Sequence, residues 1–212
     1  MHHSLPLHPD RDCGKPSVWL TKERGKVLQW THYPQDGGDN MQNGQVSVFT
    51  GNGKGKTTSA LGLALRAAAA GSRVFILQFI KKGDYSEIKA LGRLSDRITV
   101  EQHGLGRFTT ERPAPEDIQA SLRGLERARE VIPSGQYDVV ILDEANVAVK
   151  LGLLGVQELV GLILSKPDRL HLVITGRYAS PMIIDLADRV TEFKARKHYM
   201  QKGVAAREGI EF

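Results

Sequence analysis

Apolar and polar residues follow one another in blocks, and from residue 45 onward the blocks predict strands and helices in turn. Two runs, Arg73–Phe79 and Tyr137–Glu144, are almost continuously apolar and are bounded by glycine or polar residues. Such runs are typical of parallel strands that are buried on both faces. Shorter runs have similar boundaries, and the strands predicted in this way span residues 45–50, 73–79, 98–102, 137–144, 170–175 and 189–193.

The stretches between these strands predict helices. In residues 115–133, Ile118, Leu122, Leu125 and Ile132 fall on one helical face, after a start that contains proline and acidic residues. Regular alternation of strands and helices is typical of a parallel sheet with helices on both faces. Further helices are expected at residues 59–70, 88–94, 145–154, 156–164 and 180–188.

Residues 1–44 differ from the rest of the chain, because neither a strand period nor a helix period persists in them. Their only apolar clusters are Val18–Leu20 and Val27–Trp30. We expect this segment to be a disordered or loosely attached extension. Residues 45–212 are expected to form one domain, which has enough residues for a substantial core.

A glycine-rich loop with the sequence GNGKGKTT follows the first predicted strand and leads into the first predicted helix. In this context glycines let several backbone N–H groups point at one anion, and the helix N-terminus adds partial positive charge. Lys56 adds a full charge, and the Thr57 hydroxyl can bind Mg²⁺. Thr50 stands where the standard pattern has its first glycine. The candidate phosphate-binding residues are Gly51, Asn52, Gly53, Lys54, Gly55, Lys56, Thr57 and Thr58.

Asp143 and Glu144 end the apolar run at residues 137–144. Beside a phosphate loop, such an acidic pair binds Mg²⁺ directly or through water and can activate a nucleophile. Arg177 follows another strand end, where it either neutralises phosphate or forms a surface salt bridge. Together these features predict a three-layer, P-loop NTPase-like α/β fold with a mostly parallel central sheet.

Composition bears on the partners of the protein, its cysteine chemistry and its location. The formal net charge of +5 favours anionic partners, but aromatic residues are only 6% of the chain and Lys/Arg runs are absent, so nucleic acid is an unlikely partner. Cys13 is the single cysteine, which excludes an intrachain disulfide and a cysteine-rich zinc site and fits a cytoplasmic location. No apolar run reaches the length of a membrane helix, so no membrane association is expected.

A polyphosphate held by Lys56, Thr57 and a Mg²⁺ ion at Asp143 and Glu144 suits two kinds of reaction. In one, a nucleophile attacks a phosphorus atom, as in kinases and ATPases. In the other, a nucleophile attacks carbon and the whole triphosphate leaves. The motif by itself does not choose between them.

The chain resembles the ATP:corrinoid adenosyltransferases of the P-loop type. The resemblance covers about residues 46–212 and is based on GNGKGKTT, the VILDE strand end, Thr175–Arg177, and Lys197-His198 followed by a Gly-Ile-Glu-Phe end. It implies that cobalt(I) of a corrinoid attacks the 5′ carbon of ATP, which gives an adenosylated corrinoid and triphosphate. It also implies a phosphate loop that holds ATP in the reverse direction, so that the ribose carbon faces cobalt.

The resemblance implies roles for individual residues. Asn52 to Thr58 would surround the triphosphate, with Lys56 and Glu144 as the catalytic candidates. Thr57 and Glu144, with Asp143 beside them, would hold Mg²⁺, and Arg177 would lie by the phosphates. Phe108 would face the corrin ring. The family habit also implies a homodimer and a reductase that supplies electrons to cobalt.

Two features depart from the family pattern. Many members have Phe-Thr-Trp in the corrin-facing loop, whereas here Thr110 follows Phe108-Thr109 and Arg107 is an extra residue. Members also often have a basic N-terminal helix over the active site, and residues 1–40 predict no such helix. The alternatives are a P-loop phosphotransferase or ATPase that acts on a small molecule or nucleic acid, and a nucleotide-gated module that binds nucleic acid without catalysis.

Overall fold

The computed structural model describes residues 43–106 and 113–197, together with residues 207 and 209. The chain divides into two units, residues 1–40 and residues 41–212, and the fold described below is that of the second. Within the described residues, no helix combines the length and the apolarity that crossing a membrane requires.

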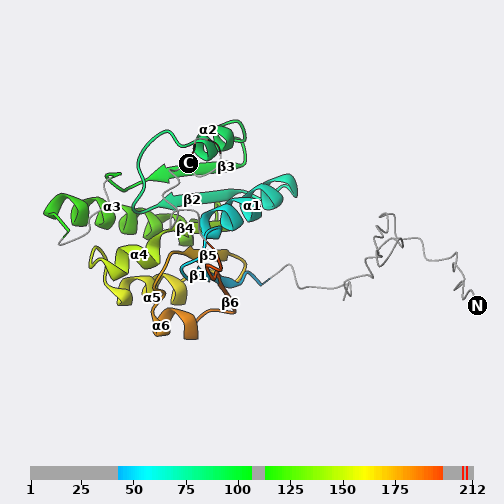
Figure 1. Cartoon of the computed structure of the whole chain (residues 1–212). Helices are drawn as coiled ribbons and strands as arrows, with labels where there is room; N and C mark the ends of the chain where they lie inside the picture. Colours follow the sequence, from blue (N-terminus) through cyan, green and yellow to red (C-terminus); the bar gives the residue numbers. More distant parts are fainter. Residues whose placement is uncertain (1–42, 107–112, 198–206, 208, 210–212) are drawn as a thin grey trace, which may run out of the picture. The chain divides into compact units, whose positions relative to one another are not determined.

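A six-stranded sheet forms the centre of this unit, and each pair of neighbouring strands is parallel (Figure 1). The strand order is β3-β2-β4-β5-β1-β6. The expected three-layer α/β fold is therefore confirmed, and the sheet is parallel throughout. The strands are β1 (Val46–Thr50), β2 (Val74–Gln78), β3 (Ile98–Gln102), β4 (Val139–Asp143), β5 (His171–Thr175) and β6 (Arg189–Glu192).

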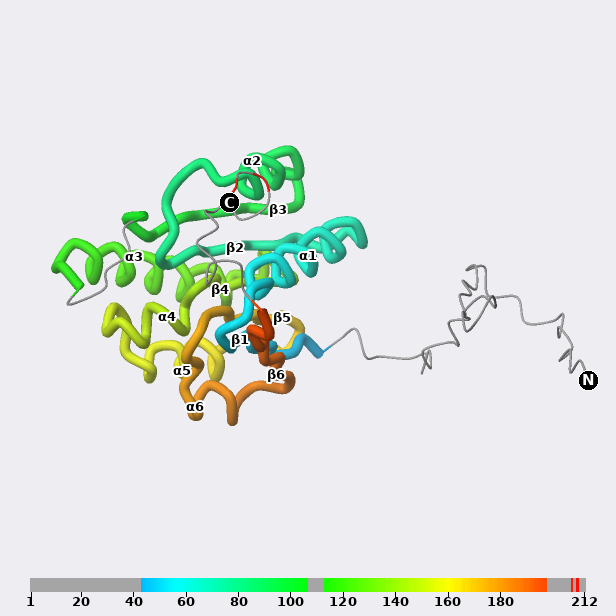
Figure 2. The backbone as a smooth tube through the Cα atoms, viewed as in Figure 1, coloured from blue at the N-terminus to red at the C-terminus, as the bar shows by residue number. Residues whose placement is uncertain are grey.

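Helices cover both faces of the sheet (Figure 2). Those on one face are α1 (Lys56–Ala69) and α2 (Ser86–Gly92), and those on the other are α3 (Pro115–Val131), α4 (Ala145–Lys150), α5 (Val156–Leu164) and α6 (Pro181–Asp185). Several helix boundaries differ from the sequence-based expectation, and two of them have a clear local cause. The first helix begins at Lys56 and not at Ser59, because Gly55 in a left-handed conformation starts it directly after the loop. The fourth helix ends at Lys150, before Gly152 with a φ of +74°.

Alternate residues of each central strand point to opposite faces and enter two separate hydrophobic cores. In β2, Phe75 and Leu77 contribute to the core under α3 to α6, whereas Val74 and Ile76 contribute to the core under α1 and α2. All five residues of β2 are buried. This double burial explains why the central strands are almost continuously apolar.

The strand order determines which loops meet. Because all strands are parallel, their carboxyl ends lie along one edge of the sheet. Along this edge β5 lies between β1, which leads into the phosphate loop, and β4, which ends in Asp143. The end of β5 is therefore placed to connect the two motifs.

Candidate active site

The glycine loop at residues 51–55 lies against the chain that follows β6. Phe193 N–H donates to the Thr50 carbonyl at 2.8 Å, and Gly53 N–H donates to the Phe193 carbonyl at 2.6 Å. Gly51 has a φ of +93°, and a side chain there would overlap the Phe193 backbone. The late first glycine thus has a structural reason, because the close approach to Phe193 occurs at position 51 and not at Thr50.

Lys56 is the first residue of α1 and is buried under the loop. Its ammonium donates hydrogen bonds to the carbonyl oxygens of Gly51 at 2.8 Å and Gly53 at 2.7 Å. Burial lowers the pKa of Lys56 and the charge of Arg177 adds to this, while Glu144 and Asp143 act in the opposite direction. Arg177 thus contributes positive potential at the phosphate-loop lysine.

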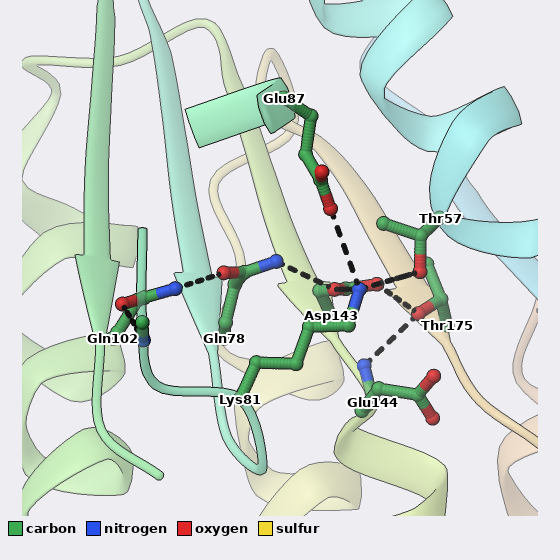
Figure 3. Close-up of polar contacts among 9 residues, drawn as sticks. Thr57, Gln78, Lys81, Glu87, Gln102, Asp143, Glu144 and Thr175 are labelled. Carbon is green, nitrogen blue, oxygen red and sulfur yellow. Dashed lines mark hydrogen bonds and ion pairs between the residues drawn. The ribbon is translucent and has the colours of Figure 1, made fainter. Parts of the chain in front are cut away.

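Asp143 is buried, and its carboxylate is surrounded by donors. Its Oδ1 accepts hydrogen bonds from the Thr57 hydroxyl at 2.9 Å and the Thr175 hydroxyl at 2.7 Å. Its Oδ2 accepts one from Gln78 Nε2 at 2.9 Å and lies 3.4 Å from Lys81 Nζ (Figure 3). A carboxylate offers about four lone-pair positions, so these donors hold Asp143 in one orientation.

Thr175, the last residue of β5, connects Asp143 to Glu144. Its hydroxyl donates to Asp143 and accepts the Glu144 backbone N–H at 3.0 Å. Glu144 has a φ of +60°, an uncommon conformation for a residue with a side chain. The Thr175 bond holds the Glu144 backbone at the N-cap of α4, and the Glu144 carboxylate is directed away from Asp143 (Figure 3).

The Glu144 carboxyl group has an elevated pKa. Burial raises it most and the nearby Asp143 charge raises it further, against the lowering influence of Lys81, Lys56 and Arg177. The charged form of Glu144 is therefore less favourable here than in water, and added positive charge in the site would offset this. Strained backbone and a perturbed carboxyl group at one position are typical of functional sites.

A hydrogen-bonded chain of glutamines extends from Asp143 toward β3. Gln78, at the end of β2, accepts from Gln102 Nε2 at 2.8 Å, and Gln102 Oε1 accepts the Gly83 N–H at 3.1 Å (Figure 3). In the sheet register Gln78 stands beside both Asp143 and Gln102. No sequence motif singles out these glutamines, although Gln78 ends the apolar strand β2 as Asp143 ends β4.

The residues present fit a Mg²⁺ ion bound together with a polyphosphate. The Thr57 hydroxyl gives its hydrogen to Asp143 and keeps lone pairs for a cation. Among the described residues no group of three or more His, Cys, Asp and Glu side chains could hold a metal. Mg²⁺ does not need such a cage, because it is usually bound by one or two protein ligands, substrate phosphates and water.

The remaining predicted site residues have different positions. Asn52, Lys54 and Thr58 are exposed on or beside the loop, and Arg177 is exposed after β5. Phe108 lies outside the described residues, as do His198 and most of the chain after it. The structure therefore brings together the phosphate loop, Asp143, Glu144 and Arg177.

A family model and several known proteins are similar to this chain over most of its length. A family model described as ATP:corrinoid adenosyltransferase BtuR/CobO/CobP matches residues 42–212. A corrinoid adenosyltransferase of Pseudomonas aeruginosa is 35% identical over 173 residues, which cover 81% of this chain and 85% of the relative. The corrinoid adenosyltransferases of Escherichia coli and Salmonella typhimurium are both 34% identical over 178 residues, which cover 81% of this chain and 87% of each relative.

Proposed function

The chain belongs to the ATP:corrinoid adenosyltransferase family, and we propose that the loop at residues 51–58 and the end of β4 hold ATP for the family's reaction. That reaction moves the 5′-deoxyadenosyl group of ATP to the cobalt(I) of a corrinoid and releases triphosphate. The observation that supports this assignment best is the linkage of Thr57 to the buried Asp143. It joins the phosphate loop to the acidic strand end, as binding of a metal-associated polyphosphate requires.

The protein has two tasks in this reaction. The electron pair of cobalt(I) forms a bond to the 5′ carbon, and the bond from that carbon to the triphosphate oxygen breaks. Because cobalt(I) is itself the nucleophile, no protein side chain has to be activated. The protein neutralises the leaving triphosphate and holds the 5′ carbon in line with cobalt.

Lys56 and the loop amides perform the first task. Lys56 exchanges its bonds to the Gly51 and Gly53 carbonyls for bonds to phosphate oxygens, while Gly55 and the start of α1 direct backbone N–H groups at the same anion. Arg177 adds positive charge from the end of β5. Mg²⁺, when bound, supplies further charge neutralisation, with Thr57, Glu144 and Asp143 as the residues that hold it.

Product analysis tests the proposal. With ATP, Mg²⁺ and a chemically reduced corrinoid, we expect one intact triphosphate for each adenosylated corrinoid, measured by ion chromatography and by the corrinoid absorption spectrum. Lys56→Ala should remove nearly all turnover. ADP and phosphate as stoichiometric products would instead identify a phosphotransferase or ATPase, and near-normal turnover of Lys56→Ala at saturating ATP would contradict the site assignment.

The proposal extends to the surroundings of the site. Residues 45–212 form the adenosyltransferase domain, residues 1–44 are a loosely attached extension, and Phe108 faces the corrin ring. The enzyme works as a homodimer in the cytoplasm, with a reductase that supplies electrons to cobalt. The family resemblance supports these assignments, and the single Cys13 fits a reducing compartment. Phe108→Ala should impair corrinoids with a lower axial ligand more than corrinoids without one.

A further inference from the structure

Lys81 lies at the centre of the site, although no motif includes it. It follows β2, and its ammonium is 3.4 Å from Asp143 Oδ2 and 3.4 Å from the Thr57 hydroxyl oxygen. The same ammonium is 3.9 Å from Glu87 at the start of α2 and 5.9 Å from the centre of the Tyr85 ring. Figure 3 shows the Lys81 side chain reaching from the β2 end into the cluster around Asp143.

The ammonium of Lys81 occupies the place that a divalent cation bound to Thr57 would need. The hydrogen of the Thr57 hydroxyl is donated to Asp143, so Lys81 approaches a lone pair of the same oxygen. Asp143 Oδ2 is likewise shared between Gln78 and Lys81. A divalent cation that binds Thr57, directly beside Asp143, must therefore compete with a resident positive charge.

Lys81 is also able to leave this position. Its side chain is 24% exposed, and that of Glu87 is 27% exposed, whereas Asp143 is almost completely buried. The ammonium's contacts with Glu87 and Tyr85 do not involve Asp143, so they can persist when the contact with Asp143 is lost. Lys56, by comparison, is buried and bonded to two loop carbonyls.

We propose that Lys81 is the resident counter-ion of Asp143, and that it moves from Asp143 to the triphosphate when the divalent cation and ATP enter. This inference rests on the proposed function of the site. In the nucleotide-free enzyme Lys81 balances the buried Asp143 charge, which would otherwise be unpaired and costly. In the ternary complex the cation takes over that charge, and the released ammonium becomes a further ligand of the leaving triphosphate.

The proposal predicts opposite effects of one substitution on two ligands. Lys81→Met keeps the length of the side chain and removes its charge. Without nucleotide, it should bind Mn²⁺ about tenfold more tightly than the unchanged enzyme, which corresponds to about 1.4 kcal/mol. With Mg²⁺ present, it should bind ATP about tenfold more weakly. Electron paramagnetic resonance of free Mn²⁺ and isothermal titration calorimetry with ATP measure the two affinities.

Two further variants make the test specific. Lys82→Met removes the same charge from the adjacent, exposed residue and should change neither affinity appreciably. Lys81→Arg keeps the charge and should retain ATP binding. Unchanged Mn²⁺ affinity in Lys81→Met, or equal shifts in Lys82→Met, would overturn the role of Lys81. Failure of the unchanged enzyme to bind ATP would contradict the proposed function instead, since the Mn²⁺ measurement contains no nucleotide.

Discussion

The Thr175 hydroxyl is a single group on which the positions of both acidic residues depend. It is fully buried, donates to Asp143 and accepts from the Glu144 backbone. Loss of one partner in such a buried arrangement leaves other polar groups without hydrogen bonds. The methyl part of the side chain contributes nothing to these bonds, so size and hydrogen bonding can be tested separately.

We expect Thr175→Val to lower the free energy of unfolding by about 1–3 kcal/mol, because it leaves the Glu144 N–H and one Asp143 position unpaired. For a domain of this size the melting temperature should fall by about 2–4 °C for each kcal/mol. Thr175→Ser keeps the hydroxyl and should retain ATP binding, which Thr175→Val should weaken. Equal behaviour of the two variants in thermal melts and ATP titrations would contradict this linking role.

Glu144 is expected to destabilise the nucleotide-free protein at neutral pH. Burial and then Asp143 raise its pKa above the ordinary glutamate value of 4.5, so the folded state binds the proton more strongly than the unfolded state does. Its favourable contribution to stability is therefore complete below pH 4.5 and is lost as the pH rises through the folded-state pKa. At neutral pH the ionised carboxylate remains as a cost.

Glu144→Gln should accordingly be more stable than the unchanged protein at about pH 8, and the difference should shrink as the pH falls toward 4.5. The same variant should lose Mg²⁺-dependent activity, because the amide cannot supply a negative charge to the cation. Denaturant melts across this pH range, with activity assays at several Mg²⁺ concentrations, measure both effects. A pH-independent stability difference would show that burial of the charge is not its cause.

At the scale of elements, the phosphate loop and β6 depend on each other. Gly51 approaches the Phe193 backbone so closely that a Cβ would overlap it, and its φ of +93° disfavours any side chain. Residue 193 is also bonded to Thr50 and Gly53, so the chain after β6 acts as a support for the loop. A change at Gly51 should therefore affect both elements together.

A pair of glycine substitutions tests this dependence. Gly51→Ala should lower stability by more than about 1 kcal/mol and weaken ATP binding, because its conformation and surroundings both exclude a methyl group. Gly62→Ala, in the middle of α1, meets nothing within 4 Å and should raise stability by about 0.5–1 kcal/mol. Thermal melts and ATP calorimetry on both variants provide the comparison, and a destabilised Gly62→Ala would undermine its use as the control.

The elements themselves follow closely from the sequence. Apolar runs located the six strands to within a few residues, because each is short and bounded by glycine or polar residues, and the four central strands are also largely buried. Helix ends were less accurate. The start of α1 lies inside the phosphate motif, where periodicity is absent and a left-handed Gly55 determines the boundary.

At the scale of the whole molecule, we predict that the N-terminal segment does not contribute to the stability of the domain. Residues 1–40 lack a core pattern, and the matched family region begins at residue 42. We expect a chain lacking residues 1–40 to keep the melting temperature of the full-length protein, measured by circular dichroism. Its ATP affinity by calorimetry serves as the control for an intact site. A clear fall in melting temperature would show that the segment stabilises the domain.

The sequence by itself determined the phosphate loop, the acidic strand end and the alternation of elements, because glycine conformations, helix starts and burial periodicity are local properties. Only the tertiary structure decided that Thr57 and Thr175 both bond Asp143, that Gln78 and Gln102 extend from this carboxylate, and that Lys81 enters the same cluster. These contacts depend on β5 lying between β1 and β4 and on the register of β2 with its neighbours. Strand order and register arise from packing between distant segments, which no local pattern specifies.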